Sequence, residues 1–453
     1  MITLQFSNNI PTQKVVWAAI ESSATKPLQE VFAQNGRKLV LQPGTSRQDR
    51  EKTGALAYKK AQEGSESTLL LDLSKAGNDG LDFVSGILLA SWRFDKYRTS
   101  LRDDEVRSLQ NLIVLTEQPK ELEQAFARTK ASIEGVLYAR ELTSEPSNRL
   151  YPMAYAKRLL ELEALGLEVE VLDENALQTL GMTALLAAGQ GSGYDSCVAS
   201  ISWKGKNPNE KPIVLVGKGV CFDSGGLCIK PAGDMRVMKW DKAGAGVVAG
   251  VMKALALSNS PTHVVGIVGL VENMPDGKAL KPGDVITTKS GQTVEIADTD
   301  AEGRLVLADC LWYAQERFNP KALIDLGTLT QETFASLGSA YAALYTENEE
   351  LARDLMKAGN SSQDAVWRLP MGEYFAKQLE STVADMKNLG TEHWGENGAA
   401  AEFLKRFIKS DMNCWAHIDI AGVSWIMEDS PLCTKGPTGF GVRLLEAWIH
   451  SLE

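Results

Sequence analysis

The sequence has 453 residues, of which 44% are apolar and 23% charged, and its formal net charge is -11. This profile is typical of a folded globular protein and excludes a disordered or fibrous chain. The acidic balance argues against a nucleic-acid or acidic-lipid partner, because such surfaces need clustered Lys and Arg. A chain of this length usually exceeds one hydrophobic core, so we expect two domains.

The chain has no run of eighteen apolar residues, and its first residues lack a basic segment followed by an apolar one. We therefore expect a cytoplasmic protein without a membrane contact. Six cysteines are scattered without CxxC pairs, which is typical of reduced thiols. Four histidines show neither HExxH nor HxH spacing, so any metal site would be built from oxygen ligands rather than histidine.

The N-terminal part predicts a small α/β domain. Short β-branched or leucine-rich runs at 38–41, 68–73 and 112–115 alternate with helix-like stretches. From 121 to 142 the apolar residues recur at helical spacing, and Pro146 follows soon afterwards. We expect this long helix to connect two domains, residues 1–143 and residues 144–453.

The C-terminal part predicts a larger α/β domain. Strand-like runs at 168–172, 213–216, 264–270 and 322–326 alternate with helical segments. Such alternation indicates a mixed, largely parallel sheet with helices on both faces. In sheets of this kind, ligands bind beyond the carboxyl ends of the strands.

A first cluster of glycine and charged residues follows the apolar run 213–216. It consists of the segment GKGVCFDSGG at 217–226, followed by IKP at 229–231 and MKWD at 238–241. We expect a loop at the end of a strand, in which glycine lets Lys218 and Asp223 converge on one point. A structural turn with solvated charges explains any one of these residues equally well. A nucleotide-binding loop is rejected, because the GxxxxGK[ST] spacing is missing.

A second cluster, DTDAEGR at 298–304, follows a strand-like run and leads into a helical stretch near residue 305. In an extended segment, Asp300, Glu302 and Arg304 would face the same side. Helix capping with one ordinary ion pair would account for a single acid but poorly for three.

The acids of the two clusters suggest a metal site. Four carboxylates can hold two divalent ions only if some of them bridge both ions. The available set is Asp223, Asp241, Asp300 and Glu302. A lysine amine can join such a set only after it loses its proton.

These motifs resemble the leucyl aminopeptidase, or cytosol aminopeptidase, family. The patterns GKGxxFDSGG, IKP and TDAEGRL stand in the order and separation of that family, and the likeness continues at 145–148, 417–422 and 436–439. The resemblance implies two divalent ions, with Asp223 and Glu302 shared between them. The implied ligands are Lys218, Asp223, Asp241, Asp300 and Glu302.

The resemblance also implies the chemistry. Lys230 and Arg304 match catalytic positions, Lys230 as a donor to the oxyanion and Arg304 as the holder of a bicarbonate ion that accepts a proton from water. The implied ions are zinc or manganese, with magnesium or cobalt as alternatives. The implied substrates are peptides with a free N-terminus, and the implied assembly is a homohexamer.

The substrate site is implied in the same way, by Lys230, Met238, Leu329, Gln331 and Ala421. Gln331 stands where the family usually has Gly, so we expect a narrower or more polar pocket and no strict preference for leucine. Asp298 replaces a usual Asn and Lys242 a usual Met, which could alter the metal preference through added charge.

Other residues and functions were weighed against this reading. His393, Trp394 and His417 are more simply explained as packed side chains than as catalytic groups, and Cys221 and Cys228 as wall residues. Clustered carboxylates with Lys and Arg would also suit a metal-dependent phosphohydrolase. A non-catalytic regulatory protein on the same scaffold is a third hypothesis.

Overall fold

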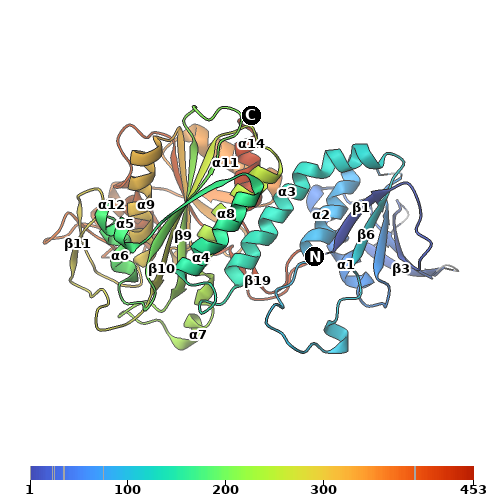
Figure 1. The fold of residues 1–453 in the computed structure, drawn as a ribbon, viewed down its shortest axis with the longest axis horizontal. Coiled ribbons are helices and arrows are strands. Elements are labelled where there is room, and N and C mark those ends of the chain that lie inside the picture. The colour runs from blue at the N-terminus through green and yellow to red at the C-terminus, as the bar shows by residue number, and fades with distance from the viewer. Residues whose placement is uncertain (1, 23, 25, 34–35, 75, 392–393) are drawn as a thin grey trace. The chain divides into compact units, whose positions relative to one another are not determined.

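The computed structural model describes residues 2–22, 24, 26–33, 36–74, 76–391 and 394–453. The chain forms two compact units (Figure 1). The first contains the chain up to Ile133 together with Met427–Gly436, and the second contains Glu134–Ile426 and Pro437–Glu453. The long helix α3 (Pro119–Ser144) is divided between the units. The two compact units meet between residues 133 and 134, inside this helix. The domain boundary predicted between residues 143 and 144 therefore stays a prediction.

The first unit is built on a six-stranded sheet, and the runs predicted at 38–41, 68–73 and 112–115 are confirmed as strands. In spatial order the strands are β1 (Thr3–Ser7), β6 (Asn111–Leu115), β5 (Thr68–Asp72), β2 (Val16–Ile20), β4 (Gly36–Leu41) and β3 (Leu28–Ala33). All neighbours are parallel except β4 and β3. The unit also contains α1 (Arg47–Ala61) and α2 (Leu81–Ala90), with short 3-10 turns η1 (Gly77–Gly80) and η2 (Asp103–Glu105).

The second unit is built on an eight-stranded mixed sheet. In spatial order the strands are β15 (Val366–Arg368), β14 (Ala342–Tyr345), β17 (Trp415–Asp419), β13 (Ala322–Gly327), β9 (Ile213–Asp223), β10 (Val264–Asn273), β8 (Cys197–Trp203) and β7 (Glu168–Leu172). The four central strands, β17, β13, β9 and β10, are parallel. The predicted mixed, largely parallel sheet is confirmed.

Helices cover both faces of this sheet (Figure 1). One face packs against α4 (Pro152–Leu160) and α8 (Ala243–Leu257), with α11 (Glu349–Ser362) and α14 (Val442–His450) nearby. The other face packs against α6 (Thr183–Gly189) and α9 (Glu302–Phe318), with α13 (Glu396–Lys405) against α9. Because both faces are covered, β10 is buried along its whole length and β9 at every residue except Phe222, and both strands are rich in apolar residues.

The remaining elements are short. They are the helices α5 (Glu174–Thr179), α7 (Ala232–Met235), α10 (Gln331–Leu337) and α12 (Glu373–Lys377), the 3-10 turns η3 (Glu161–Leu165) and η4 (Met238–Lys242), and the strands β11 (Val285–Thr287), β12 (Thr293–Glu295), β16 (Met386–Lys387), β18 (Trp425–Ile426) and β19 (Gly436–Pro437). None of the helices in the described part of the chain combines the length and apolar character that a membrane span requires.

Candidate functional site

The first part of the first predicted cluster, 217–223, lies on a strand, and the expected loop begins only at Ser224. β9 continues to Asp223, so both Lys218 and Asp223 project from it, and the expectation of a loop after 213–216 is wrong. The physical reason is close packing by α8, since a Cβ added at Gly217 would lie 2.7 Å from the carbonyl oxygen of Gly244. Glycine here lets the helix backbone approach the strand.

The second predicted cluster is the start of a helix, not an extended segment. α9 begins at Glu302, so the side chains of Glu302 and Arg304 point roughly 200° apart around the helix axis. Before it, the backbone N–H of Asp300 donates to Asp298 Oδ1 at 2.8 Å, which fixes the turn. The expectation that Asp300, Glu302 and Arg304 face one side is therefore wrong, and Arg304 points away from the two acids.

Two lysines hold the four acids in pairs. Lys218 Nζ lies 2.8 Å from Asp241 Oδ2 and 2.8 Å from Glu302 Oε1. Lys230 Nζ lies 2.8 Å from Asp223 Oδ2 and 2.6 Å from Asp300 Oδ1. We call these six residues the acid cluster: Lys218, Asp223, Lys230, Asp241, Asp300 and Glu302. Each ammonium group thus occupies a position between two carboxylates.

The acid cluster is buried except for the partly exposed Lys230 and Asp300, and it contains more acids than lysines. Four carboxylates and two ammonium groups leave two negative charges uncompensated if all six groups are ionised. Burial, followed by repulsion from Asp223 and Glu302, raises the pKa of Asp300 to about 7. Burial likewise raises the pKa of Asp241 well above its usual range. Removing water from like charges explains both shifts.

The lysines of the cluster remain protonated. Burial alone would lower the pKa of Lys218, but Asp241 and Glu302 more than offset it, so its pKa lies above the usual lysine range. The pKa of Lys230 is raised in the same way, mainly by Asp223 against the effect of burial. Lys218 also donates to the carbonyl oxygen of Thr328 at 2.8 Å.

Several acid oxygens keep room for a cation. Oxygens from Asp223, Asp300 and Glu302 lie within 4.8 Å of one another, a spacing suited to a shared ion. Among the described residues, the buried oxygens Asp241 Oδ2, Asp300 Oδ1 and Glu302 Oε1 are each approached by a lysine ammonium group at 2.6 to 2.8 Å, and Glu302 Oε2 accepts no hydrogen bond. Buried acceptors of this kind need a partner, and a divalent ion satisfies oxygen ligands directly. The residues present therefore fit a metal.

Two motif glycines make space for these side chains. A Cβ at Gly303 would lie 2.4 Å from Lys218 Cε, and one at Gly225 would lie 2.3 Å from the carbonyl oxygen of Cys228 and 2.9 Å from Asp300 Oδ1. Gly225 also has φ +86°, a left-handed conformation that favours glycine. The glycines of both motifs thus serve the packing of charged groups.

Sequence reasoning missed Asn273, which orients the cluster from the end of β10. Its Nδ2 donates to Asp223 Oδ1 at 2.9 Å and to the carbonyl oxygen of Thr299 at 3.0 Å. This amide therefore ties β9 to the segment that carries Asp300. A polar residue three positions after the apolar run 264–270 was the available signal.

Sequence reasoning also missed Asp419, at the end of β17. Its carboxylate accepts hydrogen bonds from the backbone N–H groups of Leu329 at 3.2 Å and Ala421 at 3.0 Å. Thr330 adds its own N–H and hydroxyl at 3.1 and 2.7 Å. One buried carboxylate thus brings together two residues predicted to bind substrate. The adjacent Thr328 donates to Asp241 Oδ1 at 2.5 Å, which links this loop to the acid cluster.

The other predicted substrate residues lie at the surface or partly buried. Met238 is half-buried in η4, where Trp240 Nε1 donates to its sulfur at 3.1 Å. Gln331 is exposed and is the first residue of α10.

Arg304 contacts a different group of residues. It is buried, and its Nη1 donates to the carbonyl oxygen of Asn388 at 2.7 Å and lies 2.5 Å from Glu396 Oε1. Asn388 in turn accepts from the backbone N–H of Ala297 at 2.8 Å and donates to the carbonyl oxygen of Asp298 at 2.6 Å. Asn388 and Glu396 were both missed, because they lie more than 80 residues after the acids.

The departures noted in the sequence have local explanations. Lys242 is fully buried, and its Nζ donates to the carbonyl oxygens of Glu145 and Lys239 at 2.8 and 2.7 Å. Its side chain therefore holds two backbone segments together. Asp298 accepts the N–H of Asp300, as an Asn side-chain oxygen could.

His417 and Cys221 have the packing roles expected of them, whereas Trp394 does not. His417 is buried, with Nδ1 2.5 Å from Asp325 Oδ1, and its ring stacks on Tyr345. Cys221 is buried in β9, and burial raises the pKa of its thiol. Trp394 is exposed, so the expectation that it is a packed side chain is wrong. His393 lies outside the described residues.

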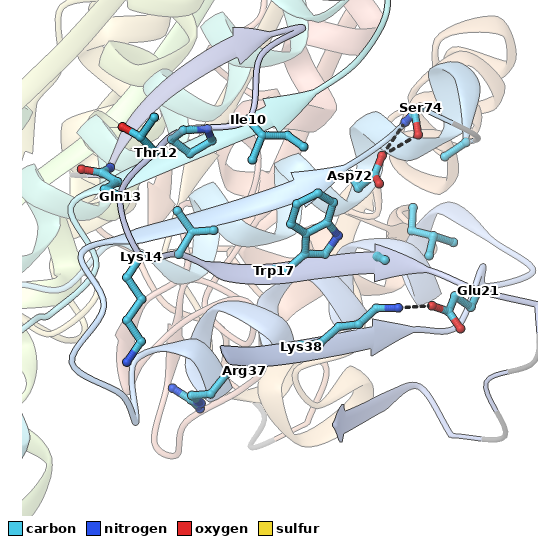
Figure 2. Close-up of a pocket in the computed structure, with 15 residues that line it drawn as sticks. Ile10, Thr12, Gln13, Lys14, Trp17, Glu21, Arg37, Lys38, Asp72 and Ser74 are labelled. Carbon is cyan, nitrogen blue, oxygen red and sulfur yellow. Dashed lines mark hydrogen bonds and ion pairs between the residues drawn. The ribbon is translucent and has the colours of Figure 1, made fainter. Parts of the chain in front are cut away.

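A hollow of about 880 Å³ lies on the first unit (Figure 2). Trp17 projects into it, and the charged side chains around it are paired. Lys38 Nζ lies 2.6 Å from Glu21 Oε1, and Asp72 Oδ1 accepts from the N–H and hydroxyl of Ser74. The hollow is a sizeable concavity, but the buried pairs of acids are in the acid cluster of the second unit. Volume alone does not mark the site.

Comparison with known proteins shows the family of this chain. Residues 137–446 match the model of the cytosol aminopeptidase family, catalytic domain. The chain belongs to the cytosol aminopeptidase family. Cytosol aminopeptidase of Rickettsia prowazekii is 42% identical over 454 residues, 98% of this chain and 89% of that protein. A probable cytosol aminopeptidase of Sinorhizobium fredii is 43% identical over 406 residues, 88% of this chain and 81% of that protein.

A solved structure has the same fold. The bottromycin maturation enzyme BotP in complex with Mn superposes with a TM-score of 0.87 at 32% identity, covering 97% of this chain and 99% of that chain. As a member of the cytosol aminopeptidase family, the protein is a metal-dependent aminopeptidase that acts on peptides. This membership favours an aminopeptidase over the phosphohydrolase and the non-catalytic scaffold.

Proposed function

We propose that the acid cluster binds two divalent ions and hydrolyses the N-terminal residue from peptides. The observation that carries the proposal is the division of four carboxylates between two ammonium groups. Each ammonium marks a position where a cation contacts two acids. The proposed ligands are Lys218, Asp223, Asp241, Asp300 and Glu302, with Asp223 and Glu302 shared. Lys218 can join only as a neutral amine, so metal binding must release its proton.

Metal ions bound by these residues would supply a water of lowered pKa and would polarise the scissile carbonyl. Residues of the chain would stabilise the oxyanion and bind the amino group of the substrate. If cations occupied Asp223 and Asp300, Lys230 would be free to donate an N–H hydrogen bond to the developing oxyanion of the substrate. The carbonyl of Leu329 accepts from the free amino group of the substrate, on a loop that Asp419 holds in place.

Contact with a free amino group would make the enzyme an exopeptidase. Met238 and Ala421 would line the pocket for the first side chain, with Gln331 at its edge, which supports a preference broader than leucine. The exposed position of Gln331 fits a residue at a pocket entrance better than one deep inside it.

The metal is proposed to be manganese or zinc, with magnesium and cobalt as weaker candidates. Manganese is supported by the similar BotP, which was solved with Mn. Carboxylate-rich sites suit manganese, and a single lysine nitrogen does not exclude zinc.

Bicarbonate fits this chain less well than the metal does. The resemblance gives it a place beside Arg304, but that guanidinium already contacts a carbonyl oxygen and the carboxylate of Glu396. A bicarbonate ion would have to displace Glu396 or share a single cation with it.

The oligomeric state and the cellular location are proposed from the same family resemblance. A homohexamer in the cytoplasm is proposed from the resemblance to cytosol aminopeptidases. The net charge of -11 supports the absence of a nucleic-acid partner.

The test is a pair of peptides that differ only in N-terminal acetylation, assayed with manganese or zinc after removal of bound metal. We expect cleavage of the free peptide alone, dependence on added metal, and two bound ions per chain by elemental analysis. Equal cleavage of both peptides would contradict the exopeptidase mechanism, and full activity without metal would contradict the two-metal site.

A further inference from the structure

Arg304 has a carboxylate partner built into the chain. Glu396 is the first residue of α13, and its side chain is 12% exposed. Its Oε1 lies 2.5 Å from Arg304 Nη1, and its Oε2 accepts from the backbone N–H of Gly390 at 3.2 Å. The first turn of a helix favours an acidic side chain, so the position suits an anion.

This carboxylate occupies the anion position beside Arg304. Glu396 Oε1 is buried and lies 2.5 Å from Arg304 Nη1. A second anion would have to displace this carboxylate or share one guanidinium with it. Glu396 thus supplies from the chain itself the acceptor that a bound anion would otherwise supply.

Asn388 connects this pair to the acid cluster. Its carbonyl oxygen accepts from Arg304, while its side chain holds the backbone of Ala297 and Asp298 directly before Asp300. Arg304 itself stands two residues after Glu302 in the first turn of α9. Glu396 is thus held against the segment that carries two of the proposed ligands.

Peptide hydrolysis needs a proton acceptor, and few groups here can serve. As the oxygen of water bonds to the carbonyl carbon, water gives up a proton, which later passes to the leaving amine as the C–N bond breaks. Arg304 cannot accept it, because a guanidinium stays protonated. The four acids of the cluster and the neutral amine of Lys218 would be occupied by the proposed cations, and Lys230 is an ammonium donor.

We propose that the carboxylate of Glu396 accepts the proton of the attacking water, in the place beside Arg304 that the resemblance gives to bicarbonate. Glu396 then returns the proton to the leaving amine, so the carboxylate is regenerated in each turnover. Arg304 holds the carboxylate in position. The inference rests on the proposed hydrolysis at the acid cluster.

The first test measures bicarbonate binding and needs no activity. Metal-loaded wild type and Glu396→Ala are dialysed to equilibrium against carbon-14 bicarbonate. We expect no bound bicarbonate in the wild type and about one equivalent in Glu396→Ala, where the guanidinium has lost its carboxylate. One equivalent bound by the wild type would overturn the proposal, and this arm does not depend on how any variant folds.

The second test measures turnover in buffer freed of carbon dioxide. Wild type should keep its full rate, whereas Glu396→Gln should lose about 100-fold in kcat with unchanged metal content. Glu396→Ala should be similarly slow and regain at least tenfold on addition of bicarbonate. A wild-type rate that falls when bicarbonate is removed, or a wild-type kcat in Glu396→Gln, would overturn the proposal.

Glu402→Gln is the matched control. Glu402 is a buried acid on the same helix that accepts from the backbone N–H of Gly372 at 2.7 Å. Its variant should keep kcat within about threefold, so a comparable loss would assign the Glu396 effect to α13 as a whole and overturn the proposal. Failure of hydrolysis in all variants including wild type would refute the proposed function, whereas the dialysis result would still decide this inference.

Discussion

The acid cluster of the second unit and the hollow of the first unit contain the same kinds of residue but differ in burial. In the hollow, the side chains of Lys38 and Glu21 are 34% and 37% exposed, and water shares their solvation. In the cluster, the side chains of Lys218 and Glu302 are 4% and 1% exposed. An exposed ion pair contributes little, about 0–1 kcal/mol, because water screens it.

This difference shows that buried acids in excess over their lysine partners, rather than the volume of a concavity, mark the candidate active site. Lys38 has one acid and the solvent, whereas Lys218 and Lys230 each hold two acids and still leave negative charge over. Buried carboxylates in that state call for cations. Substitutions in the acid cluster, at a buried acid outside it and in the hollow should therefore have effects of different size.

The largest effect is expected at Glu302. Glu302→Gln removes one negative charge and a shared ligand, so the chain should lose at least one bound ion and about a thousandfold in kcat/KM. Elemental analysis and peptide cleavage measure the two losses. Glu21→Gln, in the hollow, is the matched control and should change neither. Full metal content with full activity in Glu302→Gln would remove the basis for the contrast.

A smaller effect is expected at Lys230. Lys230→Met removes the proposed oxyanion donor but no metal ligand, so kcat should fall about 100-fold or more while KM and metal content stay close to wild type. Steady-state kinetics with elemental analysis separates the two roles. A variant that loses metal along with activity would show that Lys230 supports the ions instead.

Asp309 is a buried acid outside the acid cluster, so it tests the effect of burial on an acid without an effect on the proposed catalysis. It is fully buried on α9 but accepts three backbone hydrogen bonds, from Ala184, Leu185 and Lys289 at 2.8 to 3.0 Å. Burial, against these hydrogen bonds, raises the pKa of Asp309 to about 6. The folded protein therefore binds this proton more tightly than the unfolded chain, whose aspartate pKa is about 3.9.

The free energy of unfolding should consequently fall as pH rises from about 4 to about 6, by about 3 kcal/mol for this group. Asp309→Asn cannot titrate, so the difference in unfolding free energy between wild type and this variant should decrease across that range. Urea unfolding at several pH values measures it. A constant difference would show that the three N–H groups hold the carboxylate ionised throughout.

The smallest effect is expected in the hollow. Lys38→Met breaks its ion pair with Glu21, and the free energy of unfolding should change by less than about 1 kcal/mol with no change in kcat or metal content. Thermal unfolding and peptide cleavage check both. A clear loss of activity would show that the hollow contributes to catalysis and would contradict the contrast with the acid cluster.

Much of the fold was readable from local patterns. Short apolar runs became β4, β5 and β6 in the first unit and β7, β10 and β13 in the second. The period of apolar residues also anticipated α3, because one face of a long helix must be buried. Such signals depend on neighbouring residues and need no knowledge of distant partners.

The ends of these elements were decided by packing. β9 continues through Lys218 to Asp223 because α8 lies close against Gly217, a contact with residues nearly thirty positions later. α9 begins at Glu302, three residues earlier than the sequence suggested. Glycine and charge ordinarily indicate a loop, and here the tertiary contacts override that tendency.

For the site, the sequence by itself determined which residue types were available and which family they resemble. The tertiary structure alone decided how they are grouped: Lys218 between Asp241 and Glu302, Lys230 between Asp223 and Asp300, and Arg304 against Glu396. The physical reason is that ion pairing depends on distance and burial, which the chain creates only when strands and loops far apart in sequence are brought together.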